Sequence, residues 1–270
     1  MQKKMQKKMR IAALGDNCID IYDETGECYV GGNPVNVASY IRRLGGESAY
    51  VGAAGDDAYG ALVREKLEER GVDVSHLHIL PGRTAVTHVL LENGDRKFGE
   101  YEKGVLKDFA LDEEDLEFIC GHAMAVSGIY GSMEVEIQRL HERDKDLQIA
   151  FDFSDEHQDP AVEEVLPYVD YAFFSLEEKE EDNAEAFLKK RKELCEGLVI
   201  VTMGSAGSMA YDGTDFVRCG IVPCRVVDTM GAGDSFIAGF LYARLQGKSV
   251  LESMKSGAWN SSITLQYKGA

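Results

Sequence analysis

The chain has 270 residues, of which 44% are hydrophobic and 28% are charged, a composition typical of a globular protein with a large core. Acidic residues number 47 against 29 basic ones, and the formal net charge is -18. This charge argues against a protein that binds nucleic acid or an anionic membrane surface. A small-molecule substrate is the partner class that remains.

The cysteines and the N-terminus indicate the compartment. Six cysteines form no C-x-x-C pair and no histidine stands at zinc-site spacing, so we expect reduced thiols. No apolar run approaches about 18 residues, and no apolar signal core follows the basic start. Residues 1–9, which repeat M-Q-K-K, are predicted to be a disordered tail, with Met9 as an alternative start of translation. One cytoplasmic domain is expected over residues 10–270.

In chain order, short β-like runs alternate with helical patterns, which predicts an α/β fold with a mainly parallel sheet. The first half of the chain predicts strands at 11–14 and 49–53 and helices at 35–44 and 59–70. Strand-like runs at 87–92 and 97–101 then flank Asn93-Gly94-Asp95, a strong hairpin signal. We expect a small antiparallel flap between Val72 and Lys103, and β-lid segments near 17–31 and 76–104.

Beyond the lid the same alternation resumes. Strands are predicted at 123–127, 148–153, 171–174 and 198–202, with two short strands around the Asp212-Gly213 turn and a strand-like run at 225–227. Helices are predicted at 232–246 and 250–265. No linker separates independent domains, so one domain with an inserted lid is expected.

The strongest chemical signal is D-T-M-G-A-G-D at 228–234, between a strand-like run and a predicted helix. Gly231, Ala232 and Gly233 would leave backbone N–H groups open to a phosphate at a helix start. Asp234 would stand in the first helical turn, where a carboxylate can accept the proton of an attacking hydroxyl. The alternative is a glycine turn followed by an acid that complements the helix dipole. Seven defined positions in this context favour phosphoryl transfer.

This motif is similar to the D-T-x-G-A-G-D signature of ribokinase-like (PfkB) sugar kinases. Residues 31–38, G-G-N-P-V-N-V-A, resemble that family's N-terminal signature, about 200 residues upstream. The resemblance covers the chain from Arg10 onward and implies a three-layer α/β/α core, a β lid, ATP and Mg²⁺. It also implies direct in-line transfer and a monovalent cation such as K⁺ near the anion-binding turn.

Within the family, residues 15–22, 98–101 and 151–155 resemble the kinases of fructosamines. This implies transfer of the γ-phosphoryl group of ATP to the 6-hydroxyl of fructoselysine or a related ketose. Fructose, 2-keto-3-deoxygluconate or a nucleoside remain alternative substrates. A non-catalytic sugar-binding regulatory protein is the alternative of another class. A dehydrogenase is disfavoured, because no G-x-G-x-x-G follows the first strand.

By the same resemblance, the sugar is bound by polar residues near the first strand and helix and by the lid. The predicted contacts are Asp16, Asp20, Gly31, Gly32, Asn36, Arg96 and Tyr101. Polar side chains that follow strands lie at the carboxyl edge of an open α/β sheet, where ligands bind. Taken alone, Asp20 and Asn36 are more typical of turn capping and backbone satisfaction. An arginine in the lid could bind the carboxylate of an amino-acid substituent.

The nucleotide is expected on the other side of the anion-binding turn. The predicted contacts are Thr202, Gly204, Ser205, Gly207, Thr229 and Asn260, the last near the adenine. Relatives carry N-x-x-E after a core strand, whereas this chain has Ser175 in the Asn position and keeps Glu178 as the candidate metal ligand. His76 and His78 share one strand face, but the sequence shows no third metal ligand. A homodimer through the exposed edges of the lid is expected.

Overall fold

The computed structural model describes residues 9–92 and 95–269, without the side chains of residues 90–98. The predicted tail therefore lies outside the described residues except for Met9, which is exposed in a turn. Within the described residues, no helix combines the length and the apolar character needed to cross a bilayer.

A nine-stranded sheet forms the middle of the molecule, in the order β13-β12-β11-β10-β9-β8-β1-β4-β5. Strand β12 pairs antiparallel with β11 and with β13, and the other strand pairs of this sheet are parallel. The strands are β1 (Arg10–Leu14), β4 (Glu47–Gly55), β5 (Asp73–Leu80), β8 (Met124–Gly128), β9 (Gln148–Asp152), β10 (Tyr171–Ser175), β11 (Leu198–Thr202), β12 (Ser208–Tyr211) and β13 (Phe216–Cys219). The predicted strands before residue 220 are confirmed to within two residues at either end.

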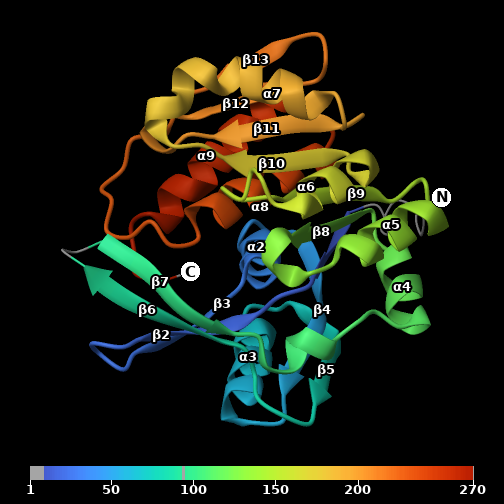
Figure 1. Cartoon of the computed structure of the whole chain (residues 1–270), viewed down its shortest axis with the longest axis vertical. Coiled ribbons are helices and arrows are strands. Elements are labelled where there is room, and N and C mark those ends of the chain that lie inside the picture. The colour runs from blue at the N-terminus through green and yellow to red at the C-terminus, as the bar shows by residue number, and fades with distance from the viewer. Residues whose placement is uncertain (1–8, 93–94, 270) are drawn as a thin grey trace.

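Helices cover both faces of this sheet. One face packs against α2 (Asn33–Arg43), α3 (Ala58–Glu69), α8 (Ala232–Leu245) and α9 (Val250–Thr264). The other face packs against α4 (Glu113–Cys120), α5 (Glu134–Arg143), α6 (Pro160–Val165) and α7 (Ala184–Lys192). In Figure 1, α6 and α7 lie in front of the sheet and α9 lies behind it. The three-layer α/β/α core is confirmed, and each interlayer space is filled by its own cluster of buried apolar side chains.

A second, four-stranded sheet, which we call the lid sheet, has the order β3-β2-β6-β7. Its strands are β2 (Cys18–Tyr22), β3 (Cys28–Gly31), β6 (Val86–Glu92) and β7 (Asp95–Glu102). Figure 1 shows β2, β6 and β7 extending sideways from the core. Strands β6 and β7 pair antiparallel, so the predicted hairpin flap is confirmed. The β2–β6 pairing is parallel. The predicted lid segment 76–104 begins too early, because its first residues belong to β5, which pairs with β4 at the edge of the large sheet.

The strand-like run at 225–227 forms no strand. Val226 and Val227 are 57% and 50% exposed, so their β-branched side chains have no sheet to pack on. The backbone N–H groups of Val227 and Asp228 instead donate to the carbonyl oxygen of Leu265. The carboxylate of Asp228 accepts from the N–H of Met230 at 2.8 Å and from that of Gly269 at 2.9 Å. The last residues of the chain thus fix the loop that leads into α8.

Side chains of α2 and α9 also hold the first turn of α8. Asn260 donates its amide to the carbonyl oxygen of Ser235 at 2.7 Å, and Ser261 donates to that of Ala232 at 2.7 Å. The guanidinium of Arg43 donates to the Ser235 hydroxyl at 2.9 Å and to the Asn260 side-chain oxygen at 2.8 Å. Because these contacts join three helices, the position of the α8 N-terminus is set by tertiary packing.

Candidate active site

A cavity of about 890 Å³ lies between the lid sheet and the carboxyl edge of the large sheet. Its walls come from the loops that follow β1 and β9, the end of β8, the N-termini of α2 and α8, and the lid sheet. This is the edge at which open α/β sheets bind ligands. The predicted residues that line it are Asp16, Asp20, Gly32, Asn36, Tyr101, Thr229, Gly231, Ala232, Gly233 and Asp234.

The N-terminus of α8 opens into this cavity. Gly231 is its N-cap with φ 69°, a left-handed conformation that favours glycine. The N–H of Ala232 donates to the carbonyl oxygen of Thr229 at 3.3 Å, whereas the N–H groups of Gly231 and Gly233 have no acceptor among the described residues. Two of the three predicted N–H donors are therefore open to an anion.

Asp234 is held by two asparagines at the start of α2. Asn33 donates to its Oδ1 at 2.7 Å and Asn36 donates to its Oδ2 at 2.8 Å. The Asn33 amide also donates to Asp152 Oδ2 at 2.9 Å, so one side chain bridges two carboxylates. Burial raises the pKa of Asp234, and the bonds from Asn36 and Asn33 partly counteract this rise. The carboxylate is thus fixed in orientation and made more basic than an exposed aspartate.

The sequence interpretation missed Asn33 and assigned no role to Asp152. Asn33 lies within the G-G-N-P-V-N segment, and Asp152 is the last residue of β9. Position after a core strand could have identified Asp152. No local pattern could have identified the bridge, because Asn33 is 119 residues from Asp152 and 201 from Asp234.

The bridge gives a first prediction. Replacing Asn33 with Ala removes a bond that favours the ionised form of Asp234, so the pKa of Asp234 rises further. The acidic limb of the kcat/KM profile should move to higher pH. The rate at neutral pH should fall roughly 10- to 100-fold, since a hydrogen bond to a charged group contributes about 1.5–3 kcal/mol. A proportional loss at every pH would contradict this positioning role.

Two further carboxyl groups are buried next to Asp234. Burial, with the charge of Asp234 as the next cause, raises the pKa of Asp16 and that of Asp152 to about 7. Asp20 accepts from the Cys18 thiol at 3.2 Å, and a Cβ at Gly31 would collide with its Oδ2. The glycine pair at 31–32 thus allows the backbone to approach the acidic side chains closely.

The predicted nucleotide residues at the end of β11 lie outside this cavity. Thr202 ends the strand, and Gly204 and Ser205 belong to the 3₁₀ turn η5 (Gly204–Ala206), which Gly207 follows at φ 88°. Glu178, at the start of η4 (Glu178–Asn183), accepts from the Ser205 N–H at 2.9 Å. This bond lowers the pKa of Glu178. Glu178 and the glycine turn therefore form one unit beside the large sheet.

Gly31 and Asn260 are also absent from the lining of the cavity, and the side chain of Arg96 is not described. Asn260 is fully buried, and its side chain is hydrogen-bonded to Ser235 and Arg43. Arg96 pairs with Leu91 across β6 and β7, and its side chain lies outside the described residues.

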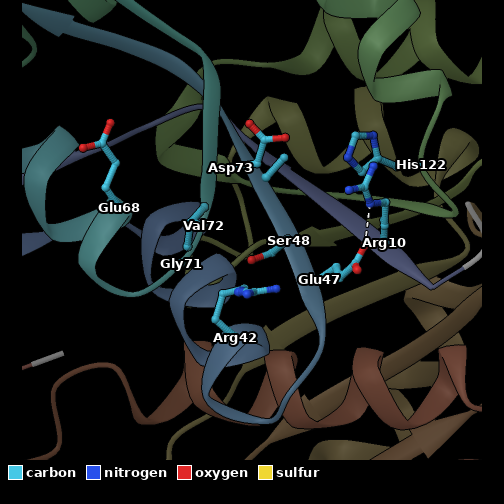
Figure 2. A pocket seen from close by; sticks show the side chains of 10 residues that line it. Arg10, Arg42, Glu47, Ser48, Glu68, Gly71, Val72, Asp73 and His122 are labelled. Atoms are coloured by element: carbon cyan, nitrogen blue, oxygen red, sulfur yellow. Dashed lines mark hydrogen bonds and ion pairs between the residues drawn. The ribbon is translucent and has the colours of Figure 1, made fainter. Parts of the chain in front are cut away.

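A smaller cavity of about 380 Å³ lies at the opposite, amino edge of the large sheet (Figure 2). Arg10, Glu47 and Asp73 line it at the first residues of β1, β4 and β5. Arg10 is paired with Glu47 at 2.6 Å, and Arg42 donates to the carbonyl oxygen of Gly46 at 2.8 Å. None of the predicted site residues contributes to this cavity.

The two histidines of β5 both contact the carboxylate of Asp115. His76 Nδ1 lies 2.7 Å from Asp115 Oδ1, and His78 Nε2 lies 3.0 Å from the same oxygen. Burial alone would raise the pKa of Asp115, but the bonds from His76 and His78 outweigh it and lower that pKa. Asp115 also accepts from the N–H of Asp112 in the capping box of α4. These contacts attach α4 to the edge of the sheet.

The model of the pfkB family of carbohydrate kinases matches residues 9–270. The chain belongs to this family. The family was predicted from the two glycine motifs, and the prediction is confirmed. As a pfkB carbohydrate kinase, the protein uses ATP as the phosphoryl donor.

Curated relatives of this pfkB kinase include the fructoselysine 6-kinase of Shigella flexneri. The two sequences are 41% identical over 96% of this chain and 98% of the relative. The fructosamine kinase FrlD of Bacillus subtilis is 33% identical over 97% of this chain and 93% of the relative. Among solved structures, Arabidopsis thaliana ribokinase complexed with ribose and ATP has a TM-score of 0.86 at 24% identity, covering 97% of this chain and 93% of that one. The last comparison establishes the fold.

Proposed function

We propose that this kinase transfers the γ-phosphoryl group of ATP to the 6-hydroxyl of fructoselysine, a fructosamine. The proposal rests on one observation: Asp234 and the open N–H groups of Gly231 and Gly233 line the same cavity. A base and an anion-binding turn at the same place are what in-line transfer to a hydroxyl needs.

In this mechanism Asp234 accepts the proton of the sugar's 6-hydroxyl. Asn33 and Asn36 keep its carboxylate aimed and ionised. The N–H groups of Gly231, Ala232 and Gly233 stabilise the negative charge on the γ-phosphoryl oxygens, for which Ala232 gives up its 3.3 Å bond to Thr229. The lid sheet, through Thr87 and Tyr101, covers the sugar and excludes water.

In this proposal Asp16, Asp20 and Asn36, which line the cavity, bind hydroxyl groups of the sugar. Gly31 and Gly32 leave room for the sugar, and Arg96 of the lid binds the carboxylate of the lysine part. The similarity to fructoselysine 6-kinase over nearly the whole of both chains supports the fructosamine substrate. Fructose is the second candidate, because a fructokinase of Salmonella typhimurium is 31% identical over 86% of this chain.

The nucleotide lies toward Thr202, Gly204, Ser205, Gly207 and Thr229 in this proposal. Mg²⁺ binds proteins through one or two carboxylates and keeps several waters and phosphate contacts. The exposed carboxylate of Glu178, fixed by the Ser205 N–H, fits such a role. When bound, Mg²⁺ neutralises charge on the phosphates. A monovalent cation such as K⁺ near the α8 N-terminus is also proposed, on the family resemblance.

The proposal extends to assembly and location. Strands β3 and β7 each leave one edge of the lid sheet unpaired with another described strand, which supports a homodimer joined through the lid. All six cysteines lie in the described part of the chain and are free thiols, which supports a reducing cytoplasm.

ADP release with Mg-ATP and a panel of fructoselysine, fructose, 2-keto-3-deoxygluconate and adenosine tests the proposed reaction. Selective turnover of fructoselysine is expected. Selective turnover of another panel member would keep the kinase and remove the fructosamine. A protein that binds a sugar of the panel but releases no ADP would support the non-catalytic alternative.

A further inference from the structure

The cavity carries an excess of negative charge. Among the side chains that the structure describes, its lining includes no lysine, arginine or histidine. Its acidic members are Asp16, Asp20, Asp152, Asp155, Glu156 and Asp234. A neutral sugar cannot compensate the negative charge of the carboxylates that bind it. A lining that is acidic and contains no described cation favours a ligand that brings positive charge.

The unpaired polar atoms of the cavity agree with this requirement. Oδ1 of Asp16, of Asn33 and of Asn36 are buried and have no hydrogen-bond partner. Asp16 and Asn36 are only 6% and 4% exposed. All three atoms are acceptors, and the residues that carry them line the cavity, so a ligand that supplies donors, as hydroxyl and ammonium groups do, suits this lining.

The position of the charge along the cavity follows from the contacts around Asp152. Asn33 links Asp234 to Asp152, whose Oδ1 accepts from the N–H of Ser154 at 2.9 Å. Ser154 has φ 51°, and this turn leads the chain to Asp155 and Glu156. Because the 6-hydroxyl lies at Asp234, the far end of a ketose, with C1, is free to extend toward these two residues.

Tyr130 lines the same part of the cavity as Asp155 and Glu156. Its hydroxyl donates to Glu156 Oε1 at 3.4 Å, and its side chain is 47% exposed at the cavity. No described lysine or arginine forms an ion pair with Asp155 or Glu156. An aromatic ring beside carboxylates that form no ion pair is a common arrangement for binding an alkylammonium ion.

We propose that Tyr130, Asp155 and Glu156 form an amine subsite, which binds the protonated secondary amine on C1 of a fructosamine and selects against neutral ketoses. The inference rests on the proposed function and adds to it the residues that bind the amine of the substrate. The lysine carboxylate lies beyond the amine, outside this subsite.

The test compares fructoselysine with its ether analogue, in which oxygen replaces the secondary amine on C1 and nothing else differs. For each ligand we would measure kcat/KM and, by calorimetry without ATP, Kd. The proteins are the wild type, Asp155→Asn, Glu156→Gln and the double variant. Glu164→Gln, which removes an exposed charge from α6 outside the cavity, is the matched control.

The wild type should prefer the amine over the ether at least tenfold in both quantities. Each single variant should reduce this preference roughly fivefold, the double variant should nearly abolish it, and the control should keep it. An equal loss for both ligands, or an unchanged preference in a folded double variant, would overturn the subsite. If ADP release fails while calorimetry still shows the preference and its loss, the subsite stands and the proposed reaction fails.

Discussion

Replacing Asp234 with Asn should lower kcat roughly 10²- to 10⁴-fold, the contribution typical of a general base. The amide cannot accept the proton of the 6-hydroxyl, so the developing alkoxide is left without a base. The fold should survive the change, because Oδ1 of Asn36 has no partner and its amide can turn to accept from the new side chain. ATP should bind as before, since the anion-binding turn is intact.

Single-turnover kinetics and nucleotide binding by calorimetry would check this expectation. Asp215→Asn is the matched control, because it removes one exposed carboxylate near the β12–β13 turn, outside the cavity. The control should keep full turnover. Near-normal turnover of Asp234→Asn would refute the assignment of the base. The candidate base would then be Asp152, the other carboxylate that accepts a hydrogen bond from Asn33.

The second large effect is expected at the start of α2. Gly32 has φ 107°, and a Cβ there would lie 2.7 Å from Asn17 Cα and 2.9 Å from the Asp16 carbonyl oxygen. Both atoms belong to the backbone, so the strain cannot be relieved by a side-chain rotation. In Gly32→Ala the N-terminus of α2 must shift, and Asn33 and Asn36 shift with it. We expect kcat/KM to fall more than tenfold for every sugar, with a stability loss of about 1–3 kcal/mol.

Gly45→Ala separates strain from catalysis. Gly45 follows the other end of α2 at φ 83°, but a Cβ there would meet no atom within 4 Å. This variant should lose about 1 kcal/mol of stability and keep its turnover per folded molecule. Thermal unfolding and steady-state kinetics on both variants provide the measurement. Similar kinetic losses in the two would show that Gly32 matters for stability alone.

Local patterns in the sequence predicted most of the elements. The strand at 198–202 and the helix at 232–246 match β11 and α8 closely, because apolar runs and glycine boundaries are local properties. The two glycine motifs, with Asp234 at a helix start, were enough to predict the family, since their order and residue types do not depend on packing. The residues of the turn that leads into α8 could therefore be identified from the sequence.

Only the tertiary structure decided which distant groups meet. β5 joined the large sheet and the run at 225–227 stayed out of it, because strand pairing depends on which edge is free. The family signature pointed to Asn36, but the bridge from Asn33 to Asp152 and Asp234 needed the folded chain. The same holds for Asn260, whose amide is used in helix packing. The sequence by itself determined the elements and the chemistry of the motifs, whereas the charge and hydrogen bonding of the cavity arose from contacts between residues far apart in the chain.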